Sequence, residues 1–302
     1  MEKDLLKNVK TVEQFILNSI EEISELVAYE DTSHIGHSNQ FGDTQLKIDV
    51  LSDEIIFMNL RSSKLVKYAL SEEKPELHDM GGQQFIVTFD PLDGSSIIGV
   101  NWAVGTIYAI WPSDNNLIGQ TGRQIYTSGI AVYGPRTTVV HYNVETEAVE
   151  ELTLKKDTEG KSFWSKTKDK IHIAEKTKIF APANLRATAD NKEYEELFDY
   201  WRKKQYTLRY SGGLVPDIYQ IFLRGNGVFA NPSSQSAPAK LRFLYEVAPC
   251  AFLMEKAGGK STNGAQSILD IVVDSYVMRS TLCIGSSEEV DRFQKVVGLA
   301  VL

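Results

Sequence analysis

The sequence predicts a mixed α+β first half followed by an α/β second half, as two contiguous subdomains. Its 302 residues correspond to roughly two domains at about 150 residues each. Amphipathic helices and β-branched runs fill the first half, whereas strand-like and helical segments alternate after about residue 173. We expect the boundary between residues 165 and 180, which divides the chain into residues 1–175 and residues 176–302.

The first half begins with helical periodicity. Apolar residues recur at three- and four-residue spacing through residues 12–27, where Thr11 and Gln14 are placed as a capping box. An amphipathic helix is therefore expected to start there. A polar loop over residues 31–45 and a second helix over residues 52–68 should follow.

Strands are expected in the rest of the first half. The β-branched run at residues 85–89 predicts a buried strand, and residues 102–111 predict another. Residues 94–113 carry no charge, but their glycines, polar residues and proline make them unsuited to a bilayer. Residues 137–142 and 148–154 predict antiparallel strands joined by an acidic turn.

The second half alternates helices and strands. The expected elements are a helix at 194–204, a strand at 206–210, and helices at 215–223 and 241–257. Pro249 should kink the last of these helices, and Gly258 should end it. A strand ending at Ile284 precedes a final helix, which Ser286 and Glu289 are placed to cap.

Composition excludes several classes of partner. Thirty-two basic against 40 acidic residues give a net charge of −8, so we expect no binding to nucleic acid or to a membrane. Cys250 and Cys283 form neither a C-x-x-C motif nor a metal-spaced set, which favours a reducing, cytoplasmic setting. The acidic start of the chain resembles neither a signal nor a transit peptide, although a removed plastid leader stays possible.

The most informative segment is a turn with two carboxylates. Asp90 follows the predicted buried strand, Asp93 lies three residues on, and Gly94 permits a tight backbone turn. Carboxylates that converge this closely repel unless a cation lies between them, and oxygen ligands without His or Cys select Mg²⁺ or Mn²⁺. The amides of Gly94, Ser95 and Ser96 could cradle a phosphate. For the turn alone, a solvated loop is an equal alternative.

Other acids make a site the better interpretation. Glu72 and Glu73 precede the same strand, and Asp49 comes just before the second predicted helix. Glu246 lies within an otherwise apolar helical stretch, where a carboxylate is expensive unless something pairs with it.

These residues, and others along nearly the whole chain, resemble class I fructose-1,6-bisphosphatases. The matching segments are residues 49–52, 71–73, 89–96, 105–107 and 240–246, in the same order. Three further segments, residues 133–138, 183–188 and 206–213, resemble the sedoheptulose-1,7-bisphosphatase branch of this family.

The resemblance implies a layered sugar-phosphatase fold with metals at the junction of its subdomains. The first subdomain would carry most metal ligands and the second the distal phosphate site. Two or three Mg²⁺ ions (or Mn²⁺) would be held by Glu72, Asp90, Asp93, Glu246 and the carbonyl of Leu92. Asp49 and Glu73 would activate the water, and the amides of Gly94 and Ser95 would steady the phosphoryl oxygens. The implied reaction is hydrolysis of the 1-phosphate of sedoheptulose 1,7-bisphosphate, with fructose 1,6-bisphosphate as the alternative substrate.

A bisphosphate also needs an anion site at the far end of the sugar. Family matching offers Asn184, Arg209, Tyr210, Lys240 and Arg242. In the family, the residue that matches Arg209 reaches the active site of the neighbouring subunit, so a homodimer or a higher homo-oligomer is expected.

The chain departs from fructose bisphosphatases at two tyrosines. Asn231 and Ala187 stand where those enzymes have tyrosine, which would leave room for a seven-carbon sugar, and Arg186 could add charge. Two other interpretations are weaker. The W-D-x-A-A segment of inositol-phosphate phosphatases is missing, and a silent sugar-phosphate sensor would be free to lose the acidic ligands. Arg123 matches one position of the AMP site of animal-type enzymes, but we expect a structural role for it.

Overall fold

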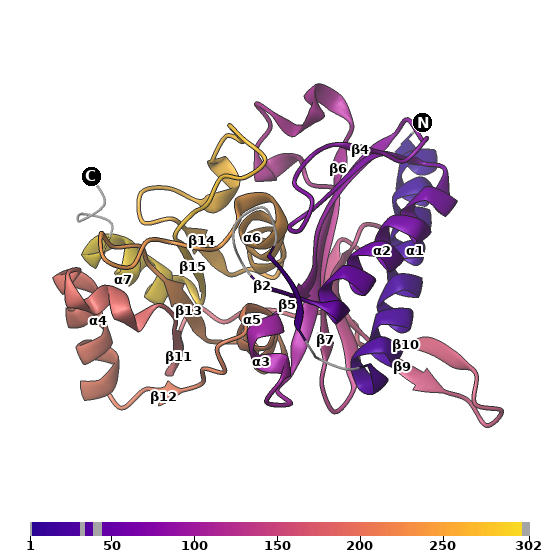
Figure 1. The fold of residues 1–302 in the computed structure, drawn as a ribbon. Coiled ribbons are helices and arrows are strands. Elements are labelled where there is room, and N and C mark those ends of the chain that lie inside the picture. Colours follow the sequence, from indigo (N-terminus) through magenta and orange to yellow (C-terminus); the bar gives the residue numbers. More distant parts are fainter. Residues whose placement is uncertain (1, 31–33, 39–43, 298–302) are drawn as a thin grey trace.

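The computed structural model describes residues 2–30, 34–38 and 44–297, and its elements stack in five layers (Figure 1). Helices α1 (Glu2–Tyr29) and α2 (Lys47–Ser63) cover one face of a large sheet. Helices α5 (Leu214–Arg224) and α6 (Ala248–Lys256) lie between this sheet and a smaller one. Helices α4 (Lys192–Lys203) and α7 (Ser287–Val296) cover the outer face of the smaller sheet. The expected layered α+β and α/β architecture is confirmed.

The larger sheet has eight strands in the order β10-β9-β8-β7-β6-β5-β3-β4. They are β3 (Val66–Ser71), β4 (His78–Asp79), β5 (Phe85–Asp93), β6 (Val104–Pro112), β7 (Thr127–Tyr133), β8 (Thr137–Asn143), β9 (Ala148–Lys156) and β10 (Ser162–Lys168). Only the β3–β5 pair is parallel among these described strands. Strand β5 is buried along its whole length, which explains why four of its five residues before Asp90 are apolar.

The smaller sheet has five strands in the order β12-β11-β13-β15-β14. They are β11 (Ile179–Pro182), β12 (Thr207–Leu208), β13 (Val228–Asn231), β14 (Lys260–Thr262) and β15 (Leu282–Gly285). Strand β11 pairs in parallel with β12 and β13, while β15 pairs antiparallel with β13 and β14. The last strand of the larger sheet ends at Lys168 and the first strand of the smaller one begins at Ile179.

Shorter elements complete the chain. They are the strand pair β1 (His34–Ser38) and β2 (Thr44–Leu46), helix α3 (Ser95–Ile98), the 3₁₀ turns η1 (Asp114–Leu117), η2 (Gly122–Gln124), η3 (Leu185–Ala189) and η5 (Ile268–Asp270), and the π-helical turn η4 (Phe243–Val247). Where the stretch 31–45 is described, it therefore contains strands rather than the loop expected from its polarity.

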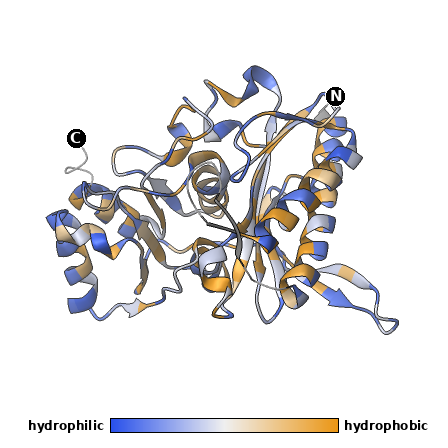
Figure 2. Cartoon of the chain, viewed as in Figure 1, coloured by the Kyte–Doolittle hydropathy of each residue, from blue (hydrophilic) through white to orange (hydrophobic). Residues whose placement is uncertain are grey.

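Apolar side chains fill all the spaces between the layers. The central space holds α6, whose residues Ala248 to Met254 are all buried. In Figure 2 the outer helices α4 and α7 show many hydrophilic residues, as expected of helices that bury only one face. None of the helices in the described part of the chain combines the length and the apolar character of a bilayer-spanning segment.

Two predicted helix boundaries in the first half are wrong. Helix α1 starts at Glu2, and Thr11 donates its hydroxyl to the carbonyl of Lys7 within the helix, so no capping box forms there. Helix α2 starts at Lys47 and is ended by Lys64, whose backbone is left-handed with φ 57°. The β-branched and aromatic residues beyond it then form β3 instead of continuing the helix.

Three predictions in the second half also need correction. The strand expected at 206–210 is only β12, and the helix expected at 241–257 begins as the π-helical turn η4. The irregularity therefore precedes Pro249, which lies in the first turn of α6 where no hydrogen-bond donor is lost. The cap of α7 is absent because the Glu289 carboxylate accepts hydrogen bonds from Trp201 and Tyr206 instead.

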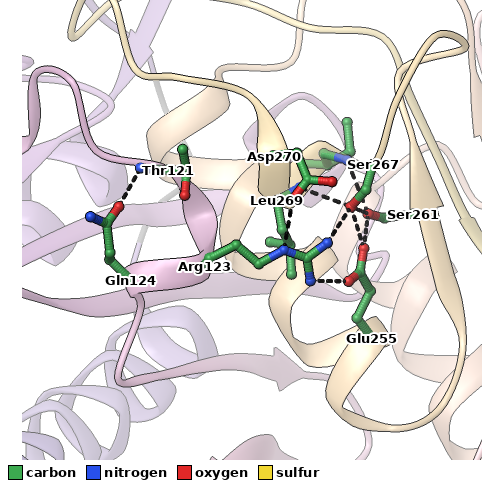
Figure 3. Close-up of polar contacts among 9 residues, drawn as sticks. Thr121, Arg123, Gln124, Glu255, Ser261, Ser267, Leu269 and Asp270 are labelled. Atoms are coloured by element: carbon green, nitrogen blue, oxygen red, sulfur yellow. Dashed lines mark hydrogen bonds and ion pairs between the residues drawn. The ribbon is translucent and has the colours of Figure 1, made fainter.

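An ion-pair network ties the two halves together around Arg123 (Figure 3). From η2, its guanidinium binds Glu255 of α6 at 2.6 Å and Asp270 of η5 at 2.9 Å. Glu255 also accepts hydrogen bonds from the hydroxyls of Ser261 and Ser267, both at 2.6 Å. With these partners, Arg123 has the structural role that we expected.

Candidate active site

The Asp90–Asp93 turn lies at the end of β5, between the two halves of the molecule. Asp90 Oδ1 accepts a hydrogen bond from the backbone N–H of Leu92 at 2.9 Å. Asp93 Oδ2 accepts one from the N–H of Val215 at 2.7 Å, at the start of α5. The positive end of the α5 dipole faces Asp93 and favours its ionised form. Gly94 leaves the strand with φ 87°, a conformation that disfavours any side chain.

Glu246 reaches the same place from the second half of the chain. The π-helical turn η4 carries it, and its Oε2 accepts the backbone N–H of Arg242 at 2.6 Å. One carboxylate oxygen each from Asp90, Asp93 and Glu246 lies within 4.8 Å of the others, and all three residues are buried. The convergence expected from the sequence is therefore present.

Glu72 joins this cluster together with Arg242. Glu72 Oε1 lies 3.1 Å from the Arg242 Nε, and its carbonyl accepts a hydrogen bond from Nη1 at 2.9 Å. The Arg242 side chain is only 3% exposed and lies beside the acidic cluster, and it does not line the cavity that holds Lys240. A guanidinium buried this deeply needs carboxylate partners, and the acidic cluster supplies them.

The cluster carries more negative charge than its protein surroundings offset. Burial, and then the charges of Glu72, Asp93 and Glu246, raise the pKa of Asp90 well above its usual value. Burial and Glu72 do the same to the pKa of Glu246. Burial raises the pKa of Asp93 to about 7, although the bond from Val215 opposes this. Because the converging donors are all hard oxygens, the set fits Mg²⁺ or Mn²⁺.

Asp49 and Glu73 lie beside this cluster. Asp49 is in the first turn of α2, where its Oδ2 accepts the N–H of Leu46 at 3.0 Å. Its buried Oδ1 accepts no hydrogen bond from any residue that the structure describes. Burial raises the pKa of Asp49 to about 7, and the charges of Glu73 and Glu72 add to this effect.

A cavity extends from the acidic cluster toward β13. Asp93 and the N-terminus of α5 form one side, and polar or cationic side chains from the second half form the other. The predicted substrate residues that line it are Asn184, Arg186, Tyr210 and Lys240, together with Asn231. The cavity thus joins a carboxylate cluster to a group of cations, as a bisphosphate site requires.

Several predicted residues lie outside this cavity. Arg209 is exposed, and its Nη1 donates to the carbonyl of Leu208 at 3.1 Å. Ala187, within η3, is fully buried in the core and does not line the cavity, so it leaves no extra room for a sugar. Gly94 and Ser95 lie at the start of α3, after the Asp90–Asp93 turn.

The sequence analysis missed Asp217. This residue is 3% exposed and lines the cavity from the first turn of α5. Its only sequence signal is an acid a few residues after the Ser-Gly-Gly segment at 211–213, and an acid in a first helical turn is common.

Comparison with known proteins assigns this fold to one family. The family model described as fructose-1,6-bisphosphatase, N-terminal domain, matches residues 3–167, and the C-terminal domain model matches residues 173–298. The chain belongs to the fructose-1,6-bisphosphatase family, whose members are phosphoric monoester hydrolases. The resemblance seen in the sequence is confirmed.

The similar proteins are named either sedoheptulose-1,7-bisphosphatase or fructose-1,6-bisphosphatase. The chloroplastic sedoheptulose-1,7-bisphosphatase of Spinacia oleracea is 49% identical over 86% of this chain, and the chain spans only 66% of that relative. A class 1 fructose-1,6-bisphosphatase of Trichlorobacter lovleyi is 37% identical over 95% of this chain and 87% of its own length. The crystal structure of a Toxoplasma gondii protein assigned as a sedoheptulose-1,7-bisphosphatase matches with TM-score 0.87 and 38% identity, covering 99% and 98% of the two chains.

Proposed function

We propose that this protein is a Mg²⁺-dependent sugar bisphosphatase that converts sedoheptulose 1,7-bisphosphate to sedoheptulose 7-phosphate. The observation that carries the proposal is the convergence of Asp90, Asp93 and Glu246 at one end of a cavity that Arg186 and Lys240 line. A substrate with a phosphate at each end matches this separation of charges. The 49% identity to a relative named for this substrate supports it.

The metal ligands would be Glu72, Asp90, Asp93, Glu246 and the carbonyl of Leu92, holding two or three Mg²⁺ ions, with Mn²⁺ as a substitute. When bound, Mg²⁺ supplies the positive charge that offsets these carboxylates and polarises the phosphoryl group. Arg242 remains paired with Glu72 at 3.1 Å and fixes the direction of that carboxylate.

Asp49 and Glu73 would handle the proton of the attacking water. The Oδ1 of Asp49 is buried without a hydrogen-bond partner among the described residues, so it can accept that proton. Leu46 holds the other oxygen of Asp49 and so orients the carboxylate. The amides of Gly94 and Ser95 would hold the phosphoryl oxygens in place during the displacement.

The distal phosphate would be bound by cationic and polar side chains. Within the cavity these are Asn184, Arg186, Tyr210 and Lys240. The amide of Asn184 already donates to the carbonyls of Pro232 and Ala237, so it would act mainly by shaping the loop. Arg209, exposed beside the cavity-lining Tyr210, would complete the site of a neighbouring subunit in a homodimer or a higher homo-oligomer.

Asn231 supports the seven-carbon substrate over the six-carbon one. It lines the cavity, and it stands at a position where fructose bisphosphatases have a tyrosine. The smaller side chain would leave room for the longer sugar. The alternative function is a fructose-1,6-bisphosphatase or an enzyme that accepts both sugars. We also propose that the protein acts in the cytoplasm or, if a leader is removed, in a plastid.

A phosphate-release assay over three substrates tests the function. Sedoheptulose 1,7-bisphosphate, fructose 1,6-bisphosphate and an inositol monophosphate are compared with and without Mg²⁺. We expect the highest kcat/KM for the seven-carbon bisphosphate and a full dependence on Mg²⁺. A clearly higher kcat/KM for the six-carbon substrate would establish the alternative. Asn231→Tyr should lower kcat/KM for the seven-carbon substrate more than for the six-carbon one.

Asp93→Asn tests the site assignment separately. The variant keeps the size of the side chain and removes the charge that a metal needs, so kcat should fall at least about a hundredfold. Activity retained at the wild-type level would show that the site has been assigned to the wrong carboxylates.

A further inference from the structure

We propose that Asp217 is a positioning residue that holds the distal phosphate loop, residues 210–213, in its binding conformation. The inference rests on the proposed function, since it concerns how that cavity grips the end of the substrate remote from the metals. The Asp217 carboxylate binds the backbone of this loop, so it would act on the substrate through the loop.

Both carboxylate oxygens of Asp217 bind the loop backbone. Oδ1 accepts the N–H of Ser211 at 2.6 Å, and Oδ2 accepts the N–H of Gly212 at 3.1 Å. In return, the N–H of Asp217 donates to the carbonyl of Gly213 at 3.3 Å. Since the side chain is 3% exposed, these contacts face little competition from water.

The loop conformation needs such support. Gly212 has φ 99°, which is outside the range that most residues adopt, and the Ser211 hydroxyl accepts the N–H of Gly213 at 3.3 Å. Tyr210 lines the cavity immediately before these residues. Because two backbone N–H groups of this loop donate to one carboxylate, the loop keeps one conformation, and the position of Tyr210 in the cavity is fixed.

The same short segment also reaches the metal end. Directly after the loop, the N–H of Val215 binds Asp93 at 2.7 Å. The short stretch 210–217 therefore connects the cavity-lining Tyr210 to the backbone N–H that binds Asp93. Asp217 is the side chain that ties the two ends of this stretch to each other.

A negative charge in an anion-binding cavity requires a reason. Asp217 would repel the distal phosphate, so its charge opposes substrate binding unless another role outweighs that repulsion. Only a carboxylate can accept two main-chain N–H groups with its two oxygens. In an asparagine, the NH₂ group would replace one carboxylate oxygen and face a backbone N–H, so two hydrogen-bond donors would face each other without an acceptor.

Asp217→Asn tests the inference. We expect KM for the bisphosphate to rise about tenfold, because one charge-assisted hydrogen bond is lost and the loop loosens. The decrease in kcat should be much smaller than this change in KM. The kcat/KM for p-nitrophenyl phosphate, which has no distal phosphate, should also decrease much less than the kcat/KM for the bisphosphate. Gly212→Ala, whose added methyl meets nothing within 4 Å but strains the left-handed backbone, should raise KM in the same way. Asp199→Asn, an acid-to-amide change on α4 outside this cavity, is the control.

Unchanged KM in both variants, or an equal loss with both substrates, would overturn the inference. Binding of inorganic phosphate, measured by calorimetry in the presence of a chelator, gives a second readout that needs no activity. Asp217→Asn should bind phosphate about tenfold more weakly than the wild type. Wild-type protein that hydrolyses neither bisphosphate would refute the proposed function. In that case equal phosphate affinities of the two proteins would overturn the positioning role as well.

Discussion

Gly105 of β6 occupies the most constrained contact near the site. It pairs with Asp93 of β5 in the sheet register. A Cβ at this position would lie 2.3 Å from the carbonyl of Ala131 and 2.4 Å from a methyl of Val215. The backbone of Val215 donates a hydrogen bond to Asp93, so Gly105→Ala should disturb both the packing and the position of this proposed metal ligand.

The size of the effect follows from these distances. Ordinary contact begins near 3.4 Å, so Val215 must retreat by about 1 Å, and packing strain of this kind typically destabilises by 1–3 kcal/mol. The same movement would stretch the 2.7 Å bond to Asp93 beyond hydrogen-bonding distance, which removes about 1.5–3 kcal/mol for a charged acceptor. Together, we expect a loss of about 2.5–6 kcal/mol in the free energy of unfolding.

Urea unfolding of the metal-free protein measures this loss, and calorimetric titration with Mn²⁺ measures the effect on the site. We expect Mn²⁺ to bind at least about tenfold more weakly, because Asp93 is no longer held in place. Gly134→Ala is the matched control, since its added methyl would meet its nearest neighbour at an ordinary 3.5 Å. A Gly105→Ala protein that matches this control in both stability and Mn²⁺ affinity would refute the reasoning.

Two further predictions concern ion pairs in which the acid is buried. Lys74 is next to Glu73, and its Nζ lies 2.6 Å from a carboxylate oxygen of the buried Asp53 in α2. Lys74→Met should therefore loosen the loop that carries Glu73 and lower kcat about tenfold, with little change in KM. Steady-state kinetics that show an unchanged kcat would contradict this prediction. Burial lowers the pKa of His141, but the Glu13 carboxylate at 3.0 Å outweighs it, so the net pKa lies above 6.5. Because the pKa of His141 is raised on folding, its protonation stabilises the folded state below the pKa of the unfolded state, and this stabilisation is lost as the pH rises. The urea midpoint of the wild type should therefore decrease from pH 6 to pH 8, and the decrease should be smaller in His141→Gln. Equal decreases in the two proteins would contradict this prediction.

The parts of the site that the sequence predicted share one property. Asp90, Asp93 and Glu246 are buried acids, and burying several carboxylates together has a high free-energy cost unless a cation or a proton offsets their charge. Neither this argument nor a local pattern can place Arg242, because a cation's position depends on which distant carboxylate it meets. Glu72, 170 residues away in sequence, decides it.

Element boundaries were harder to predict for a similar reason. The second helix was extended over residues that form β3, because their apolar spacing suits either structure and only pairing with β5 decides between them. Asp217 was missed because its partners are backbone N–H groups, which every sequence contains. Its role becomes visible only once the loop has a conformation.

The assembled acidic cluster should make the metal-free protein sensitive to pH in a way that identifies it. Burial raises the pKa of Asp93 to about 7, well above the value of 3.8 that it has in an unfolded chain. The folded state therefore binds a proton more tightly than the unfolded state does. The resulting stabilisation is complete below about pH 4 and is lost as the pH rises through about 7.

Mg²⁺, the proposed metal, should replace that proton and remove this pH dependence. In a chelator, the free energy of unfolding should decline from pH 5 to pH 8, and the decline should be smaller in Asp93→Asn, which carries no charge to neutralise. With saturating Mg²⁺ the wild type should keep its stability over the same range, because metal binding to the folded state offsets the carboxylate repulsion. If Mg²⁺ left the decline unchanged, the four carboxylates would not be sharing a cation, and the catalytic proposal would lose its basis.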